Sequence, residues 1–232
     1  MFNNKTDIFF DLDHTLWDYD QNSTETLDHL YELFSLEKLG LNPVEKFIDS
    51  FHKANLMVWD LFDESSLNRQ ELRNKRLELV FEDFGLAGQP LEGFHEAYYT
   101  MCSRKPHLIE GAIEILEFLK PNYQLHIITN GFDDSQNDKL KYSGLKPYFT
   151  TVTTSENAGS KKPEKAYFDF ALALANVEKE NALVIGDGLR TDIRGAFNYG
   201  LDLIWLNSSS KICPFAEVVE IKKLNELIGL LN

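Results

Sequence analysis

Hydrophobic residues recur at helical spacing in the first part of the chain, from about residue 17 to residue 105. One helix face carries apolar side chains three and four positions apart, namely Leu27, Leu30, Tyr31 and Phe34. A second run with this spacing follows Pro43, a natural first-turn residue. Two further helices are expected near 68–84 and 90–101. The pattern predicts an all-helical region.

From about residue 110 the apolar runs are short and rich in Ile, Leu, Val and Thr. They predict strands at 124–129, 150–154, 182–186 and 201–206. Helices are expected between or after them, near 111–120, 133–143, 164–176, 191–199 and 221–231. Alternating strands and helices with apolar strands predict a parallel sheet covered by helices on both faces, a Rossmann-like α/β fold.

Residues 7–10 form one more apolar run, which we expect to join the same sheet. The helical region would then be an insertion after the first strand. We therefore expect an α/β core domain formed by residues 1–16 and 106–232, and an inserted α-helical cap domain formed by residues 17–105.

Asp11 and Asp13 directly follow the first apolar run. Side chains i and i+2 of a strand point the same way, so we expect both carboxylates on one side. Like charges this close repel each other unless a cation lies between them or one carboxylate is protonated. The pair suits a site in which one carboxylate attacks, the other handles a proton, and a divalent metal screens both.

Polar groups also follow the later strands, at the edge where parallel sheets bind ligands. Thr129, Asn130 and Gly131 offer a hydroxyl and backbone N–H groups to a phosphate, although Asn-Gly is also an ordinary turn. Lys162 precedes Pro163, which we expect to open the next helix with Lys162 at its N-cap. This lysine is either a surface residue or a cation that offsets negative charge in the site.

Asp187 follows the strand predicted at 182–186 and adds a third carboxylate to the same edge. Asp192 either belongs to the site or caps the helix expected at 191–199. Each cluster has an ordinary structural explanation, but their occurrence at successive strand ends favours one shared site. Hard oxygen ligands, without His or Cys at a suitable spacing, predict Mg²⁺ as the metal.

The composition restricts the class of partner. Among 232 residues, 37 are acidic and 23 basic, for a formal net charge of -14. A nucleic-acid polymer is not expected as a partner because phosphate backbones require a basic surface, whereas a small phosphorylated metabolite needs only a local cationic pocket. No apolar run reaches the roughly 18 residues of a membrane span. With two distant cysteines and no leader-like start, we expect a cytoplasmic protein of undetermined oligomeric state.

The clusters resemble the motifs of the haloacid dehalogenase (HAD) superfamily in their order along the chain. The matching residues are Asp11-x-Asp13-x-Thr15, Thr129-Asn130-Gly131, Lys162-Pro163 and Gly186-Asp187-x4-Asp192. The helical insert resembles the type-1 cap. The chain departs from the commoner family pattern at Gly188, where a hydroxyl-bearing residue is usual.

A narrower resemblance is to the YjjG-type 5′-nucleotidase branch of this superfamily. It is carried by Thr129 to Phe132, Gly144-Leu145 with Tyr148-Phe149, Ser155-Glu156, and the cap positions Asn55, Trp59 and Arg76. The resemblance implies a Mg²⁺-dependent phosphatase that hydrolyses small phosphomonoesters through an aspartyl phosphate. A nucleoside 5′-monophosphate is the substrate implied by this branch.

The family resemblance also implies a role for each residue of the core motifs. Asp11 is the expected nucleophile and Asp13 the acid and base. The Asp11 carboxylate, the Asp13 backbone carbonyl and Asp187 are the expected metal ligands. The phosphate would be bound by Thr129, Asn130, Gly131 and Lys162, with Thr15 and Asp192 in supporting roles.

Substrate selection is expected in the cap, with Trp59, Asn55 and Arg76 as candidates and Arg69 and Arg73 as weaker ones. For Trp59 the alternative is packing in the cap core, and for the arginines it is a solvated helix face. Other readings are a sugar-phosphate phosphatase or phosphomutase of the same fold, a dehalogenase, and a non-catalytic binding module. Asp13 argues against the dehalogenase, because dehalogenases lack the second carboxylate, and the intact charged site argues against the module.

Overall fold

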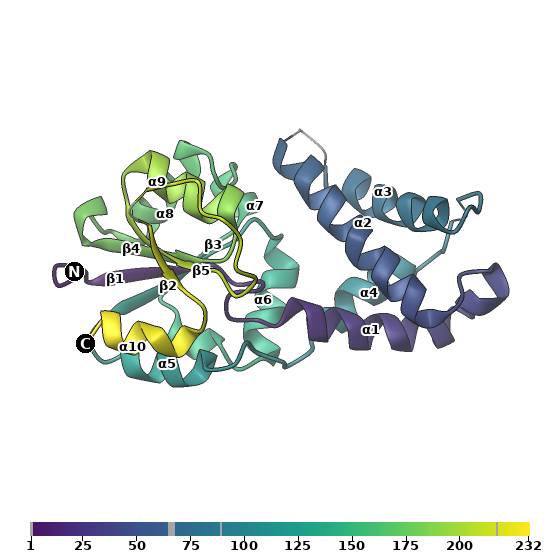
Figure 1. Cartoon of the computed structure of the whole chain (residues 1–232), viewed down its shortest axis with the longest axis horizontal. Helices are drawn as coiled ribbons and strands as arrows, with labels where there is room; N and C mark the ends of the chain where they lie inside the picture. The colour runs from purple at the N-terminus through teal and green to yellow at the C-terminus, as the bar shows by residue number, and fades with distance from the viewer. Residues whose placement is uncertain (1, 65–67, 89, 217) are drawn as a thin grey trace. The chain divides into compact units, whose positions relative to one another are not determined.

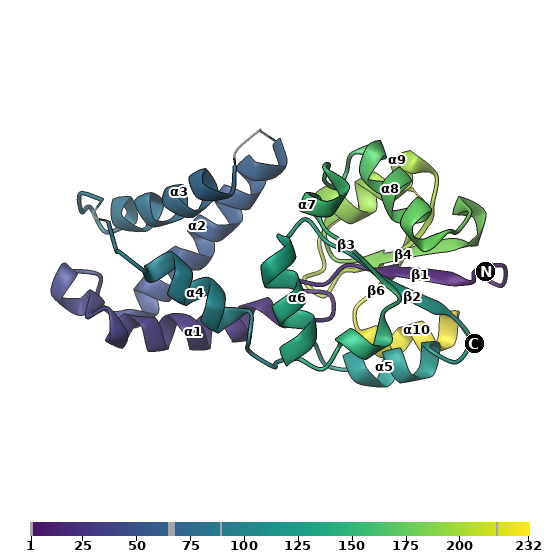
Figure 2. The ribbon, with the colours of Figure 1, turned by 180° about the vertical axis from the view of Figure 1, so that it is seen from behind.

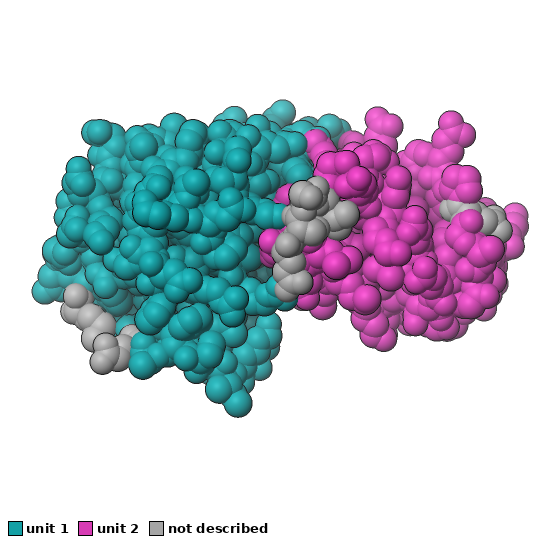
Figure 3. All heavy atoms as spheres, turned by 90° about the horizontal axis from the view of Figure 1, so that it is seen from above, with its two compact units in different colours: residues 1–19, 104–232 teal, residues 20–103 magenta. Residues whose placement is uncertain are grey.

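The computed structural model describes residues 2–64, 68–88, 90–216 and 218–232. The chain divides into two compact units, shown in different colours in Figure 3. Unit 1 consists of residues 1–19 and 104–232, and unit 2 of residues 20–103. No helix in the described parts combines the length and hydrophobicity that a bilayer-spanning segment needs.

Unit 1 is built on a six-stranded sheet with the order β3-β2-β1-β4-β5-β6. All neighbouring strands pair in parallel. The strands are β1 (Asp7–Phe10), β2 (Gln124–Ile128), β3 (Thr151–Thr153), β4 (Ala182–Gly186), β5 (Asp202–Leu206) and β6 (Val219–Ile221). The predicted α/β fold is thereby confirmed.

Helices cover both faces of this sheet (Figures 1 and 2). One face carries α5 (Ala112–Leu119) and α10 (Leu227–Leu230), and the other carries α8 (Lys165–Ala175) and α9 (Arg194–Tyr199). Every residue of β1 is buried, which explains its continuous apolar run. Phe9 of β1 belongs to the same hydrophobic cluster as Tyr167 and Phe168 of α8.

Two short elements depart from the expected ones. We expected a helix over 221–231, but the chain first adds the edge strand β6, whose Ile221 pairs with Leu206 of β5. Only α10 is α-helical in that segment. The short helix α7 (Ser155–Ala158) was also not predicted. Both of these segments are too short to show a period of two or 3.6 in the sequence, so their pattern is ambiguous.

Unit 2 is helical, with α1 (Tyr19–Leu33), α2 (Val44–Glu64), α3 (Arg69–Asp83) and α4 (Phe94–Cys102). Its core is aromatic and includes Phe47, Phe51, Phe94 and Tyr98, whose rings contact one another. We expected the cap to begin at residue 17. Trp17 instead pairs with Leu108 and donates its indole N–H to the Lys105 carbonyl at 3.2 Å, and it belongs to unit 1.

Candidate active site

The central strands bring the polar clusters to one edge of the sheet. Asp11 follows β1, Thr129 follows β2 and Asp187 follows β4. β1 lies between β2 and β4, and Phe10 is in register with Ile127 on one side and Ile185 on the other. Residues just beyond these strands therefore meet at the carboxyl edge.

Lys162 lies at the centre of the acidic groups. Its ammonium group donates to Asp11 Oδ1 at 2.6 Å, Asp192 Oδ1 at 2.6 Å and the Ile128 carbonyl at 2.9 Å. The residue is only 1% exposed, so the surface-lysine alternative is wrong. Lys162 does not cap a helix, however, because α8 begins at Lys165 with Glu164 as its N-cap.

Asp11, Asp187 and Asp192 form an acidic cluster in which one carboxylate oxygen from each residue lies within 4.8 Å of the others. Thr15 is fully buried beside it, and its hydroxyl lies 3.1 Å from Asp11 Oδ2 and 3.3 Å from Asp187 Oδ1. Asp192 is not simply a helix cap, because its other oxygen accepts the Gly188 N–H at 3.0 Å while the first binds Lys162.

Burial makes ionisation of this cluster costly. It raises the pKa of Asp11 to about 7, against the attraction of Lys162 and with added repulsion from Asp192. Burial followed by repulsion from Asp11 raises the pKa of Asp187 to about 6. Burial alone would lower the pKa of Lys162, but Asp11 and Asp192 outweigh it and raise that pKa, so the lysine stays charged.

The charge and donor type of the cluster fit a divalent cation. The cluster has three carboxylates and one ammonium, which pairs with Asp11 and Asp192, so two negative charges are uncompensated when all three acids are ionised. Carboxylate oxygens are the donors that Mg²⁺ prefers. A bound ion would favour the ionised forms that burial and mutual repulsion disfavour.

Hydrogen bonds from neighbouring residues fix the phosphate loop, which consists of the expected phosphate-binding residues Thr129, Asn130 and Gly131. The Asn130 side chain donates to the Lys162 carbonyl at 2.9 Å and accepts the Lys162 N–H at 2.8 Å, which joins two of the motifs. The Thr129 hydroxyl accepts the Gly131 N–H at 3.1 Å. The Tyr167 hydroxyl accepts the Thr129 N–H at 2.7 Å, so this cradle is supported by a residue that the sequence did not single out.

Two glycines leave room for the acidic cluster. A Cβ at Gly186 would lie 2.6 Å from the Asp192 carboxyl carbon. A Cβ at Gly188 would lie 2.2 Å from the Thr191 hydroxyl oxygen and 2.7 Å from Asp192 Oδ2. The Thr191 hydroxyl thus occupies the space that a side chain at position 188 would need, which gives a structural reason for glycine there.

Asp13 is not a member of the acidic cluster of Asp11, Asp187 and Asp192. β1 ends at Phe10, so Asp11 and Asp13 both lie beyond the strand, where strand alternation no longer fixes side-chain directions. The carboxylate of Asp13 accepts hydrogen bonds from Lys139 and Gln136 of α6 (Asp133–Tyr142). The Asp13 carboxylate is therefore bound by α6, whereas Asp11 is bound by Lys162. Sequence reasoning missed both α6 partners because they lie more than a hundred residues away in the chain.

The cap candidates lie in unit 2. Asn55 is 5% exposed, and Trp59 contacts Phe62 on the same helix at 5.3 Å between ring centroids. Arg76 is 1% exposed, and it donates to the Tyr99 hydroxyl at 2.9 Å. For Arg76 the solvated-face alternative is wrong, because its side chain is inside the cap.

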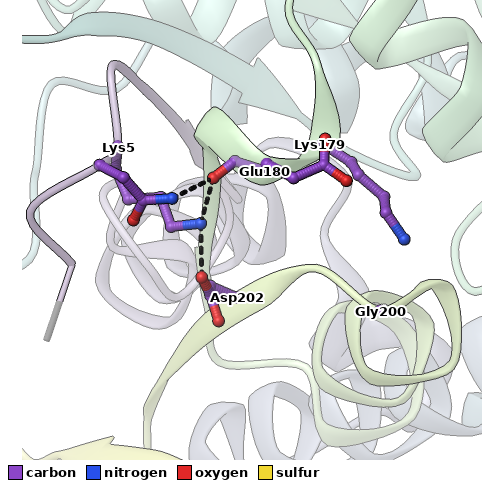
Figure 4. A pocket seen from close by; sticks show the side chains of 6 residues that line it. Lys5, Lys179, Glu180, Gly200 and Asp202 are labelled. Atoms are coloured by element: carbon purple, nitrogen blue, oxygen red, sulfur yellow. Dashed lines mark hydrogen bonds and ion pairs between the residues drawn. The ribbon is translucent and has the colours of Figure 1, made fainter.

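A pocket of about 310 Å³ lies at the opposite edge of the sheet (Figure 4). Lys5, Glu180 and Asp202, near the starts of β1, β4 and β5, line it. The Lys5 ammonium donates to the Glu180 carbonyl at 2.6 Å and forms an ion pair with Asp202. Its charge is already compensated, so we assign this pocket a structural role.

Comparison with known proteins identifies the family of the chain. The family described as haloacid dehalogenase-like hydrolase matches residues 8–206. Pyrimidine 5′-nucleotidase YjjG of Escherichia coli is 32% identical over 97% of this chain and 96% of its own. Pyrimidine 5′-nucleotidase PynA of Streptococcus pneumoniae is 32% identical over 86% of this chain and 83% of its own.

Among solved structures, magnesium-bound YfnB of Bacillus subtilis superposes with a TM-score of 0.86 at 30% identity, covering 98% of this chain and 99% of that one. The chain belongs to the haloacid dehalogenase-like hydrolase family. The prediction of an enzyme of this family is confirmed.

Proposed function

We propose that the protein is a Mg²⁺-dependent phosphatase that hydrolyses nucleoside 5′-monophosphates through an aspartyl phosphate on Asp11. The observation that carries this proposal is the buried Lys162 ammonium, 2.6 Å from both Asp11 and Asp192, beside the Asp187 carboxylate. Two relatives with 32% identity are named pyrimidine 5′-nucleotidases, which favours a pyrimidine base in the substrate.

In the first step, a carboxylate oxygen of Asp11 attacks phosphorus and the bond to the leaving oxygen breaks. Asp13 gives its proton to the departing alkoxide. In the second step, water attacks the phosphorus and gives a proton to Asp13. The Asp11–phosphorus bond then breaks, which releases phosphate and restores both carboxyl groups to their initial states.

The charged and polar groups near Asp11 support this chemistry. Lys162 would offset negative charge on the phosphoryl oxygens, and Thr129 with the Asn130 N–H and Gly131 would hold them. The metal ligands would be the Asp11 and Asp187 carboxylates and the Asp13 backbone carbonyl. Mg²⁺ bound there would offset the repulsion between the nucleophile and its anionic target. Thr15 and Asp192 would orient these groups.

The cap would select the leaving group, with Trp59 and Asn55 as the candidates to recognise the base. The burial of Arg76 among Phe51, Tyr98 and Tyr99 favours an indirect role for this residue, through support of the cap interior. A sugar-phosphate phosphatase or phosphomutase remains the alternative function, since it would use the same core groups.

The test is phosphate release from a panel of pyrimidine and purine monophosphates and sugar phosphates, with Mg²⁺ or with EDTA. We expect the highest kcat/KM on pyrimidine monophosphates, no turnover in EDTA, and none for Asp11→Asn. Asp169→Asn is the matched control, because Asp169 pairs with Lys165 on the surface of α8. Preference for sugar phosphates would reject the nucleotidase proposal, and normal turnover by Asp11→Asn would reject the mechanism.

A further inference from the structure

The Asp13 carboxylate is held from one side by helix α6. Lys139 Nζ donates to both of its oxygens, at 2.6 Å to Oδ1 and 2.8 Å to Oδ2. Gln136, one helical turn earlier, donates its side-chain N–H to Oδ2 at 3.3 Å. Residues three apart share a helix face, so α6 presents both donors together.

The Lys139 ammonium is itself held between two groups. Its nitrogen lies 4.5 Å from the centre of the Trp17 ring, and the residue is 7% exposed. Trp17 is fully buried and anchored through its indole N–H to the Lys105 carbonyl. A buried ion pair returns little stability for the hydration it loses. Stabilisation of the fold is therefore a weak explanation for the Lys139–Asp13 ion pair.

The burial of Gln136 carries a further cost in free energy. It is 2% exposed, and its amide oxygen accepts no hydrogen bond from any described residue. An unsatisfied buried acceptor costs about 1–3 kcal/mol. The phosphate loop also makes room for this side chain, since a Cβ at Gly131 would lie 2.0 Å from the Gln136 amide nitrogen. These costs indicate that the Gln136 amide has a role in addition to packing.

We propose that Lys139 and Gln136 are positioning residues that act through Asp13. They fix its carboxyl group in the orientation from which it gives a proton to the leaving group and later takes one from water. This inference rests on the proposed function, because it takes Asp13 as the acid and base of both steps.

The two half-reactions depend differently on the position of Asp13. A p-nitrophenolate leaving group departs without a proton, so Asp11 can still be phosphorylated from p-nitrophenyl phosphate. Hydrolysis of the aspartyl phosphate still needs Asp13 to activate water. A displaced Asp13 should therefore let the aspartyl phosphate accumulate with this substrate, which gives a burst of product. With a nucleoside monophosphate, both steps should be slow.

The experiment is stopped-flow release of p-nitrophenol with Mg²⁺ by wild type, Lys139→Met, Lys139→Arg and Lys141→Met. For Lys139→Met we expect a burst of about one product per active site, then a steady rate at least about tenfold below wild type. Lys139→Arg should keep most activity, because a guanidinium can bind both oxygens. Lys141, exposed on the same helix, is the matched control and should behave as wild type.

A steady rate within twofold of wild type for Lys139→Met would overturn the inference. A burst of Lys139→Met that is smaller than one product per active site by the same factor as its steady rate is below wild type would also overturn the inference. Such a result indicates that fewer molecules are folded. If circular dichroism shows that Lys139→Met is unfolded, Gln136→Leu decides, with the same burst and a smaller loss expected. Absence of any p-nitrophenol release by wild type would overturn the proposed function as well.

Discussion

Lys162 shows how much of the site depends on single residues. One buried ammonium holds two carboxylates that come from different ends of the chain. A buried charge is tolerated only when its partners are present, and removal of one partner costs several kcal/mol. Loss of Lys162 or of one of its two carboxylate partners should therefore destabilise the remaining charged groups.

His95 is a partly buried titratable residue of the cap, outside the proposed chemistry. Burial, followed by repulsion from Arg76 and Arg73 on α3, lowers its pKa to about 4. As the pH falls, His95 binds a proton near pH 6.5 in the unfolded chain but only near pH 4 in the folded chain. Stability from this residue is complete above pH 6.5 and is lost as the pH falls through this window.

We predict that His95→Gln removes part of the acid sensitivity of the fold. Between pH 7.5 and pH 5, wild type should lose about 1 kcal/mol more free energy of unfolding than the variant, allowing for solvent screening of this partly exposed group. Urea denaturation at both pH values measures this difference. His29→Gln, an exposed histidine of α1, is the control. Equal pH slopes for wild type and His95→Gln would contradict the prediction.

At the scale of single residues, the sequence predicts which residues lie at the sheet edge better than it predicts the partners of their side chains. Asp11 and Asp187 follow apolar strands, so their place at the sheet edge could be predicted. The partners of Asp13 could not, because Gln136 and Lys139 of α6 are more than a hundred positions away in the chain. Tyr167 likewise had no local signal, since its partner Thr129 is 38 positions away.

At the scale of elements, the end of β4 sets the geometry of the acidic cluster. Gly186 is the last residue of this strand, and Asp192 packs against its Cα. The chain then makes one turn of π-helix (Leu189–Ile193) before α9, which keeps the Asp192 side chain beside the strand. π-helical turns are rare and occur often at functional sites.

We predict that Gly186→Ala displaces Asp192 and thereby loosens Lys162. Turnover should fall at least tenfold, and overpacking should lower the free energy of unfolding by about 1–3 kcal/mol. Steady-state kinetics and urea denaturation test both effects. Gly229→Ala is the matched control, because a Cβ in that part of α10 meets nothing within 4 Å. Wild-type turnover by Gly186→Ala would show that the position of Asp192 is unimportant.

The longer helices could be predicted because their periodicity is clear over ten or more residues, and the five-residue strands because their runs are rich in Ile, Leu and Val. Strands β2 and β4 and helices α2, α3 and α8 lie close to their expected ranges. The short elements β6 and α7 could not, because their formation depends on packing against neighbours. Strand β6 exists through its pairing with β5, which nothing in the sequence of 219–221 indicates.

At the scale of the whole molecule, the site joins segments that are distant in the sequence. Lys162 binds Asp11 across 151 positions, and Thr15 lies beside Asp187 across 172. A divalent cation at the acidic cluster would bridge the ends of β1 and β4. Its binding should therefore stabilise the folded chain, independently of catalysis.

We predict that saturating Mg²⁺ raises the melting temperature in the absence of substrate. At one hundred times its Kd, a bound ion adds about 2.7 kcal/mol, or roughly 5–10 °C for a chain of this size. Asp187→Asn should abolish this increase. Without Mg²⁺ the variant should melt no lower than wild type, because one buried repelling charge is gone. Differential scanning calorimetry gives both values, and an undiminished increase in the variant would contradict the assigned ligand.

The function of the core was accessible from sequence because the chemistry lies at strand ends in a recognisable order. The substrate was not, because the cap, which we propose to select it, carries aromatic and basic residues that serve packing as readily as binding. Arg76 illustrates this, since the sequence left substrate contact and a solvated helix face open, and the structure buries it among aromatic rings. Hydrophobic periodicity alone cannot separate these two roles.

The most direct measurement is chemical trapping of the covalent intermediate. Enzyme mixed with Mg²⁺ and substrate is quenched and treated with borohydride, which reduces an acyl phosphate to the alcohol, and the peptides are then sequenced by mass spectrometry. The account predicts homoserine at position 11, dependent on substrate and on Mg²⁺. Modification at another carboxylate, or none while Lys139→Met turns over p-nitrophenyl phosphate, would contradict it.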